Sequence, residues 1–268
     1  MQGKFISHKL FADEKPINVF HTEYPQITIP NADEKHADKH ILFRKKFLLS
    51  GNVSDAIIKI TADDYFKLYI NGEFVTQGPP PSYPSAYYYM ELPIGGFLKN
   101  GENTIAVHSL YQGLINRVFV SGDMREGLWA EISIGGKVVL ATDESWKCCI
   151  SSAYSPMGIV GYDTQYTELF DSRCEEIGFE KEDYDDEKWK NAVIKKYSDY
   201  KLIKSPILPL EIYDVEPKTI RKIESGFIYD FGQEAIGYFV VKAKGNIGDE
   251  IIIRQGEELN ADGSVRYE

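Results

Sequence analysis

The chain has 268 residues and a formal net charge of −11, a length that accommodates one large or two ordinary domains, and we expect two. The acidic balance argues against a nucleic-acid partner, because a phosphate backbone requires a basic footprint. The short basic run Arg44, Lys45 and Lys46 lies inside the apolar segment 41–49, so we interpret it as the solvated face of a strand.

The sequence shows no membrane span and no secretory signal. No apolar stretch reaches the roughly 18 residues of a membrane span, and residues 1–15 lack the apolar core of a secretory signal. We therefore expect a cytoplasmic protein without a membrane partner.

Cys148 and Cys149 would point to opposite sides of a strand, which leaves Cys174 as a partner for one, so we expect three reduced thiols. No CxxC or HExxH spacing is present, and the sequence predicts no zinc.

The fold class follows from the periodicity of the apolar residues. Short runs rich in Val, Ile, Tyr and Phe recur between Gly, Pro, Asn and Asp, whereas helical periodicity is scarce. The sequence therefore predicts an all-β fold. The expected strands cover residues 41–49, 55–62, 66–70, 73–77, 86–92, 104–111, 128–134, 137–141 and 147–152, and then 219–223, 227–231, 238–243 and 250–254.

Two dipeptides and one capping pattern predict local structure. Asn71-Gly72 separates two β-prone runs and favours a two-residue type I′ hairpin, since both residues tolerate φ > 0. Gly135-Gly136 predicts a second hairpin of this kind. Residues 185–192 predict a short helix, in which Asp183 or Asp185 caps the free N–H groups and Trp189 turns inward.

Prolines divide the chain into regions. We expect an extended N-terminal arm over residues 1–35, a β-sandwich over 36–200, a linker over 201–218 and the start of a second β-sandwich over 219–268. This last region supplies about four strand-length runs, and an independent sandwich needs about seven. The sequence therefore predicts a truncated second sandwich.

Several motifs together resemble a known family. The chain contains, in order, an "ING" strand end, a "GP" loop, an aromatic strand and a "FLKxGENxIAV" strand. These motifs are followed by a "YDFGQ" stretch and an "E-x-L-x-x-D-G" ending. This pattern is similar to the N-terminal region of bacterial α-L-rhamnosidases, glycoside hydrolase family 78. The residues that carry the resemblance are Ile70 to Gly72, Gly78, Pro79, Tyr87 to Tyr89, Phe97 to Lys99, Gly101 to Asn103, Ile105 to Val107, Tyr184 to Asp186, Trp189, Tyr229 to Gln233 and Glu257 to Gly263.

The resemblance implies a jelly-roll (galactose-binding-like) β-sandwich without catalytic residues. In the family, the two carboxylates that glycoside hydrolysis requires lie in an (α/α)-barrel after this segment. We transfer no catalytic residue to this chain, and we expect it to be inactive alone. The parent protein would be a glycosidase, and the missing downstream catalytic domain would be a partner.

Carbohydrate binding is the activity that the residues themselves suggest. Aromatic rings cover the apolar face of a pyranose, and neighbouring polar groups bind its hydroxyls. The candidates are Tyr83, Tyr87, Trp129, Asp123 and Arg125, the last two in a glycine-containing loop. No metal ligands are predicted. Calcium binding is known in related sandwiches, but no ligand spacing here supports it.

Three functions remain open from the sequence. The chain is the non-catalytic N-terminal region of a rhamnosidase-like hydrolase that supports the barrel and contacts a rhamnose-containing glycan, or it is a self-standing carbohydrate-binding module. The third is a β-sandwich interaction protein without a sugar ligand, which would form a homodimer through an exposed strand edge.

Overall fold

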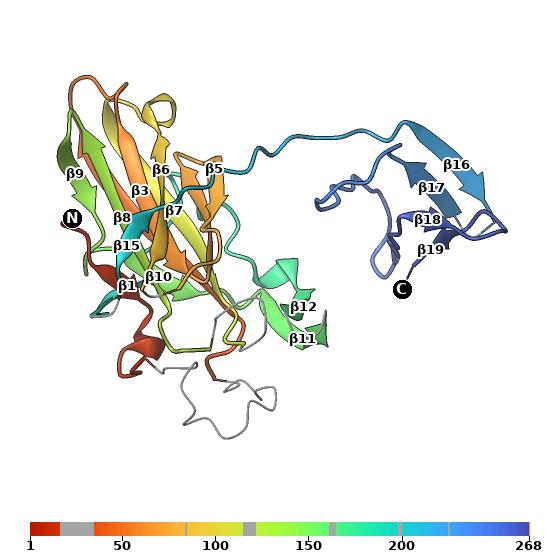
Figure 1. Ribbon diagram of the computed structural model, residues 1–268, viewed down its shortest axis with the longest axis horizontal. Coiled ribbons are helices and arrows are strands. Elements are labelled where there is room, and N and C mark those ends of the chain that lie inside the picture. Colours follow the sequence, from red (N-terminus) through yellow and green to blue (C-terminus); the bar gives the residue numbers. More distant parts are fainter. Residues whose placement is uncertain are drawn as a thin grey trace. The chain divides into compact units, whose positions relative to one another are not determined.

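The computed structural model describes residues 1–16, 35–83, 85–114, 122–160, 165–197, 200–224 and 226–267. These residues form two compact units, Met1–Leu210 and Glu211–Glu268, which are described separately (Figure 1). Helical structure in the described residues is confined to three 3-10 turns, Lys9–Phe11, Gly95–Phe97 and Ser172–Cys174. None of them is long and apolar enough to cross a membrane.

The first unit is a sandwich of two sheets, which confirms the predicted all-β fold class. One sheet has the order β14-β1-β8-β3-β6-β15, with β9 beside β8, and the other has the order β13-β10-β2-β7-β4-β5. The strands of the first sheet are β1 (Phe5–Ser7), β3 (Ile57–Asp63), β6 (Tyr87–Pro93), β8 (Gly127–Ile134), β9 (Lys137–Ala141), β14 (Val193–Lys195) and β15 (Leu202–Lys204). Those of the second are β2 (Lys39–Leu49), β4 (Tyr65–Ile70), β5 (Glu73–Gly78), β7 (Gly101–Tyr111), β10 (Lys147–Ile150) and β13 (Lys190–Asn191).

The core lies between the two sheets. Alternate residues of the central strands point inward, since successive side chains of a strand face opposite sides. Ile58 and Ile60 of β3 meet Phe43 of β2 and Val107 of β7 in one buried apolar cluster, which Trp146 also joins. Burial of such side chains removes about 1.5–3 kcal/mol of unfavourable hydration each and holds the sheets together.

The motif asparagines fix the loops at one end of the second sheet. Asn71 and Gly72 have positive φ, of 51° and 86°, and Ile70 pairs with Glu73 across the two-residue turn, so this predicted hairpin is confirmed. The side-chain amide of Asn71 donates to the Asn103 Oδ1 at 2.9 Å. Asn103 in turn donates to the carbonyl of Lys99 at 2.7 Å. The "ING" and "GEN" motifs are thus two halves of one hydrogen-bonded corner.

The predicted helix at residues 185–192 is wrong. Asp185 accepts from the N–H of Glu187 at 2.9 Å, as a cap would. The backbone N–H of Trp189 then donates to the carbonyl of Asp186, which closes a turn. The next two residues form β13, which pairs with β10. Pairing with an available strand edge outweighs the weak helical tendency of this stretch.

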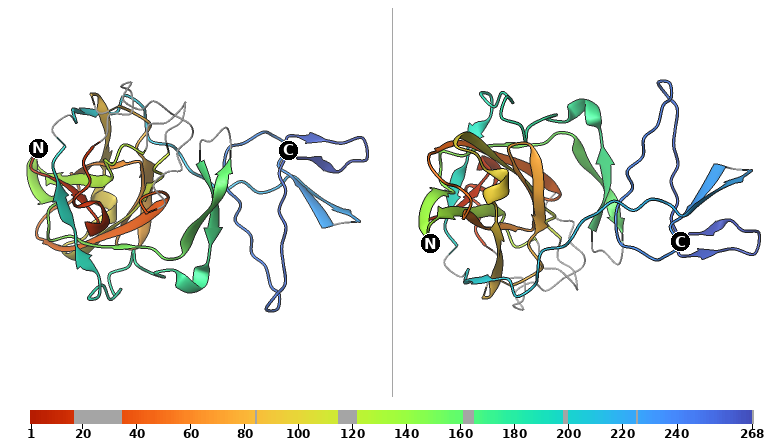
Figure 2. Two further views of the ribbon diagram at one scale, coloured as in Figure 1. Left: turned by 90° about the horizontal axis from the view of Figure 1, so that it is seen from below. Right: turned by 90° about the horizontal axis from the view of Figure 1, so that it is seen from above.

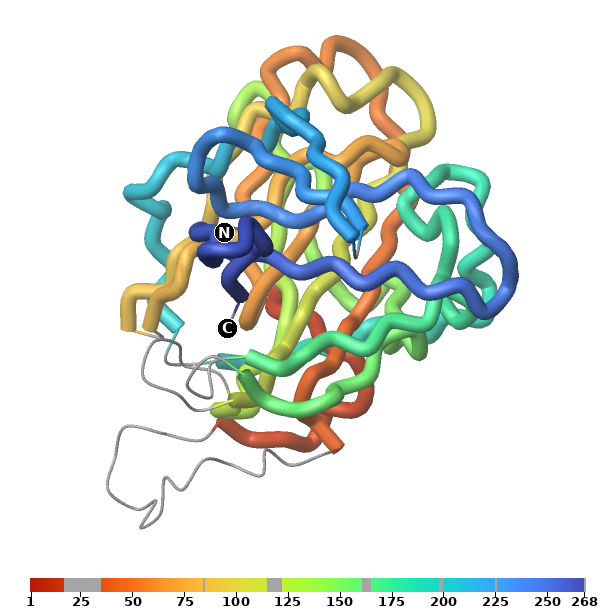
Figure 3. Tube along the Cα trace, turned by 90° about the vertical axis from the view of Figure 1, so that its right-hand side faces the viewer, coloured from red at the N-terminus to blue at the C-terminus, as the bar shows by residue number. Residues whose placement is uncertain are grey.

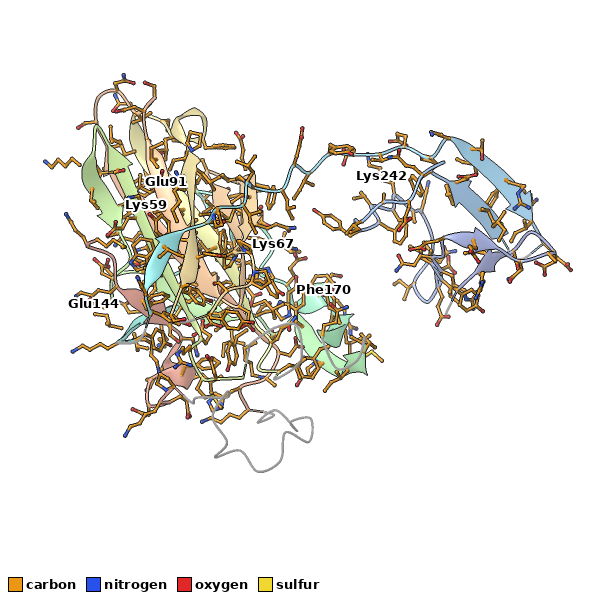
Figure 4. All side chains as sticks on the ribbon, viewed as in Figure 1. Lys59, Lys67, Glu91, Glu144, Phe170 and Lys242 are labelled. Carbon is orange, nitrogen blue, oxygen red and sulfur yellow. The ribbon has the colours of Figure 1, made fainter. Side chains whose placement is uncertain are left out.

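The sheets also contain strands that the sequence did not reveal. The N-terminal region contributes β1, which lies between β14 and β8. β15 pairs in parallel with β6, and Lys204 on it donates to Glu91 at 2.7 Å. Glu91 also lies 3.7 Å from Lys59, and both are labelled in Figure 4. Strands of three residues carry too little periodicity to be recognised.

A two-stranded hairpin, β11 (Tyr154–Val160) with β12 (Gln165–Phe170), lies beside the sandwich in both views of Figure 2. It was not predicted, because Pro156 and Gly158 interrupt the pattern. Its base is attached through Tyr154, whose ring stacks on His40 with the centroids 3.7 Å apart.

The second unit has only short pairings among its described residues. β16 (Thr219–Ile223) pairs with β17 (Gly226–Asp230), and β18 (Glu258–Leu259) with β19 (Val265–Arg266). The strands predicted at 238–243 and 250–254 are absent, and this part runs as extended loops (Figure 3). These segments form no strands, because a strand needs a hydrogen-bonded neighbour and the described residues do not supply one. Their large apolar side chains are exposed.

Candidate functional site: a buried polar cluster at the end of the sandwich

The structure brings together three of the five predicted carbohydrate-binding residues. Tyr87 on β6, Asp123 and Arg125 are buried and meet around the ring of Tyr200. Tyr87 stacks on that ring with the centroids 4.4 Å apart, and the Arg125 guanidinium lies 5.9 Å from its centre. The hydroxyl of Tyr87 donates to the carbonyl of Ala62 at 3.0 Å.

The other two candidates lie elsewhere. The indole N–H of Trp129 donates to the carbonyl of Gly3 at 3.0 Å, and its ring packs against Tyr89. Trp129 is therefore a packing residue that holds the N-terminal segment. Tyr83 is 58% exposed in the loop before β6 and forms a bridge with Ala86.

The cluster forms where the strands of the two sheets end. Asp63 closes β3 and pairs with Gly127 at the beginning of β8, so the segment before β8 lies next to the end of β3. Asp64 follows, and its carboxylate accepts from the backbone N–H of Gln112 at 2.7 Å. The hydroxyl of Tyr200 donates to the carboxylate of Asp63. Asp63, Asp64 and Gln112 are buried, and Tyr200 is partly exposed.

Asp123 and Arg125 form an ion pair inside the cluster. The Arg125 Nη1 lies 2.5 Å from the Asp123 Oδ2, and the backbone N–H of Arg125 donates to the Asp123 Oδ1 at 3.1 Å. Burial raises the pKa of Asp123 to about 7, and the carboxylate of Asp63 adds to the rise while Arg125 opposes it. Loss of water around the carboxylate therefore outweighs the ion pair.

Glu126 is the most deeply buried acid of the cluster. Its carboxyl accepts from the hydroxyl of Ser7, and its backbone carbonyl accepts from Tyr197 at 2.6 Å. Burial raises the pKa of Glu126 to about 8; Ser7 and Lys195 oppose the rise. Glu126 is thus mainly protonated at neutral pH.

Several buried oxygens of the cluster have no hydrogen-bond partner among the described residues. They are the Asp63 Oδ1, the Gln112 Oε1 and the Glu126 Oε1. A buried polar atom without a partner is unfavourable by about 1–3 kcal/mol, so a hydrogen-bond donor brought to these oxygens would stabilise the cluster. Within the described ranges, no group of three or more His, Cys, Asp or Glu has the geometry of a metal site.

Sequence reasoning missed Asp63, Gln112 and Tyr200 as members of the site. A positional signal was present for two of them, since Asp63 and Gln112 directly follow the predicted strands 55–62 and 104–111. The strand that begins at Tyr65 pairs antiparallel with the strand that ends at Tyr111, which brings Asp64 and Gln112 together. Tyr200 follows no predicted strand.

The first unit is a β-sandwich with a buried polar end, and comparison with known proteins identifies its family. Residues 51–214 match the model described as the α-L-rhamnosidase N-terminal domain, and residues 220–268 match the bacterial α-L-rhamnosidase concanavalin-like domain. The chain belongs to the family of the α-L-rhamnosidase N-terminal domain. The resemblance found in the sequence motifs is thereby confirmed.

Curated relatives are considerably longer than this chain. An α-L-rhamnosidase of Formosa agariphila is 28% identical over 243 residues, which cover 82% of this chain and 25% of the relative. An α-L-rhamnosidase of Alteromonas sp. (strain LOR) is 24% identical over 235 residues, with 81% and 25% covered. The chain spans about a quarter of the length of these relatives.

Solved structures share the fold. The rhamnosidase of glycoside hydrolase family 78 from Bacillus sp. GL1 matches with a TM-score of 0.68 at 25% identity, over 82% of this chain and 21% of that one. The Streptomyces avermitilis α-L-rhamnosidase, solved with L-rhamnose, matches with a TM-score of 0.65 at 21% identity, over 86% and 23%. The jelly-roll assignment is confirmed.

Proposed function

We propose that this chain is the non-catalytic front part of a glycoside hydrolase that acts on α-L-rhamnosides, where it supports a downstream catalytic barrel and contacts the glycan. The observation that carries the proposal is the ordered match of two rhamnosidase domain models to one chain that spans about a quarter of its relatives. The acids of the described cluster are buried and engaged with Tyr200, Arg125 or Ser7, which suits a binding role better than bond cleavage.

The activity of the chain tests the non-catalytic role. Purified residues 1–268 are expected to release no aglycone from an aryl α-L-rhamnoside, because the family's opposed carboxylates lie in the barrel. A longer product of the same reading frame is expected to be active. Turnover by residues 1–268 alone would overturn the proposal.

A self-standing carbohydrate-binding module is the second candidate, and the unpartnered oxygens favour it. The Asp63 Oδ1 and the Gln112 Oε1 can accept hydrogen bonds from sugar hydroxyls. Calorimetry with L-rhamnose, with and without calcium, measures this binding. Gln112→Met removes the acceptor at nearly constant volume and is expected to weaken binding at least about tenfold, the usual effect of one lost hydrogen bond at a buried site.

The matched control lies on the same stretch of chain. Thr104 is near the beginning of β7, its hydroxyl is also buried without a partner, and Gln112 follows the end of that strand. Thr104→Val should leave sugar affinity unchanged. Equal affinity of the Gln112→Met variant and the parent protein would exclude a sugar site at this cluster.

Association through the second unit is the basis of the interaction-protein alternative. Tyr238, Val240 and Ile252 are more than half exposed in a β-prone region without strand partners. Such edges recruit other strands, either from a downstream domain or from a second copy. Light scattering of residues 1–268 separates these cases, since a concentration-dependent dimer favours self-association and a monomer favours the downstream domain.

A further inference from the structure

A hollow lined by basic side chains lies on the six-stranded sheet, away from the residues of the polar cluster. It has a volume of about 200 Å³ and is lined by Arg44, Lys45, Lys46, Ser145, Lys147 and Asp186. Four cations and one carboxylate gather here in a chain whose formal net charge is −11. We propose that this hollow binds an anionic group of a glycan, a carboxylate or a sulfate ester.

The strand register places these charges together. Lys147 of β10 lies directly opposite Arg44 of β2, and Lys46 is two residues further along the same face of β2. Like charges at directly opposite positions destabilise a sheet. Arg44 has a structural partner in Asp186, whereas no carboxylate among the described residues pairs with Lys147, so the unfavourable juxtaposition is typical of a functional site on the side of Lys147.

Arg44 forms the rigid floor of the site. It is fully buried, so the expectation of a solvated strand face is wrong for this residue, because the segment 179–186 covers it. Its Nε lies 3.0 Å from the Asp186 Oδ2, and it also donates to backbone carbonyls, including that of Lys181 at 2.9 Å. Asp186 is the only carboxylate among the described residues that line the hollow, and Arg44 already engages it.

The lysines are left with little compensation. Lys147 donates to the carbonyl of Trp189 at 3.3 Å and forms no ion pair among the described residues. Lys45 bonds to Ser145, and Lys46 lies 3.9 Å from Glu102 at an exposed position. An incoming anion can accept from two or three ammonium groups at once, and such charge-assisted bonds are stronger than neutral ones. A single charged sugar ring or a sulfate matches the size of the hollow.

The glycan part of this inference rests on the proposed function, whereas the anion site does not. NMR titration at constant ionic strength with sodium glucuronate, sodium sulfate and neutral glucose measures binding through the amide signals of Lys46, Ser145 and Lys147. We expect saturable shifts with one or both anions and none with glucose. Sulfate alone would assign the hollow to sulfate esters, and glucuronate alone to carboxylates.

Two variants and a control locate the binding. Lys46→Gln and Lys147→Gln remove the charge and leave an unbranched polar side chain, and each is expected to weaken anion binding at least about fivefold, as loss of one close charge does. Lys99→Gln, at an exposed lysine that pairs with Glu182, should have no effect. Non-saturable shifts, an equal response to glucose, or unchanged affinity in both variants would overturn the inference. Failure of L-rhamnose to bind would count against the polar cluster alone.

Discussion

Replacing Glu126 by glutamine tests the electrostatics of the polar cluster. Glu126 is fully buried beside Ser7, and burial raises its pKa to about 8 from an ordinary value of 4.5. The folded protein therefore holds this proton over a pH range in which the unfolded chain releases it. Since the folded state then binds more protons, the free energy of unfolding must fall as the pH rises from about 4.5 to about 8.

The size of the effect follows from the pKa difference. Each pH unit within this window lowers the stability by about 1.4 kcal/mol. Glutamine has nearly the same shape and no charge, and it still accepts from Ser7. The Glu126→Gln variant should therefore exceed the parent protein by about 1 kcal/mol at pH 5 and by about 3 kcal/mol at pH 7.

Urea unfolding at several pH values measures this difference. All three tryptophans of the chain, Trp129, Trp146 and Trp189, lie in the first unit, so their fluorescence reports the unfolding of that unit. Glu144→Gln is the control, because Glu144, which is labelled in Figure 4, is exposed and lies near Lys4. If the curves of stability against pH for Glu126→Gln and the parent protein run parallel from pH 5 to pH 8, the reasoning about this carboxyl is refuted.

Three further substitutions probe the rest of the unit. Asp123→Asn should also gain stability over the parent protein as the pH rises from about 4 to 7, in the same urea assay, because burial raises the pKa of Asp123 to about 7. Arg44→Leu leaves the Asp186 carboxylate and several backbone carbonyls without their hydrogen-bond donor and should lower the unfolding free energy by about 3 kcal/mol. A loss below about 1 kcal/mol would show that the pair is unimportant. Asn103→Ala removes bonds to Lys99 and Asn71 and should lower the melting temperature by several degrees, and an unchanged melting temperature would contradict the role of this corner.

Longer strands and tight turns could be predicted because their causes are local. The segments that became β2, β3, β7 and β8 are at least seven residues long and rich in Ile, Leu, Val and Phe, and Asn71-Gly72 contains both residues of its own turn. The helix predicted over residues 185–192 is wrong for the opposite reason. Their conformation is decided by the edge of β10 and by Arg44, which lies far away in the sequence.

The polar cluster could be predicted only in part. The loop with Asp123 and Arg125 carried a local signal, because two glycines flank three charged residues there. Tyr200 reaches Asp63 across 137 positions of the chain, and no pattern within a short window reports such a contact. Among the aromatic candidates, Tyr87 lies in the cluster, whereas Trp129 is buried on β8 and donates to the carbonyl of Gly3, because the interior uses the same residue types as a sugar site.

The two proposed sites differ in charge, and salt separates them. Binding at the hollow depends on exposed ammonium groups, whose field is screened over about 10 Å at 0.1 M salt and about 3 Å at 1 M. Anion affinity there should therefore fall severalfold between these salt concentrations. Binding of a neutral sugar at Gln112 and Asp63 depends on buried hydrogen-bond acceptors and should change little. If L-rhamnose binding weakened with salt as strongly as glucuronate binding, the two ligands would share the basic hollow, and the polar cluster would be structural only.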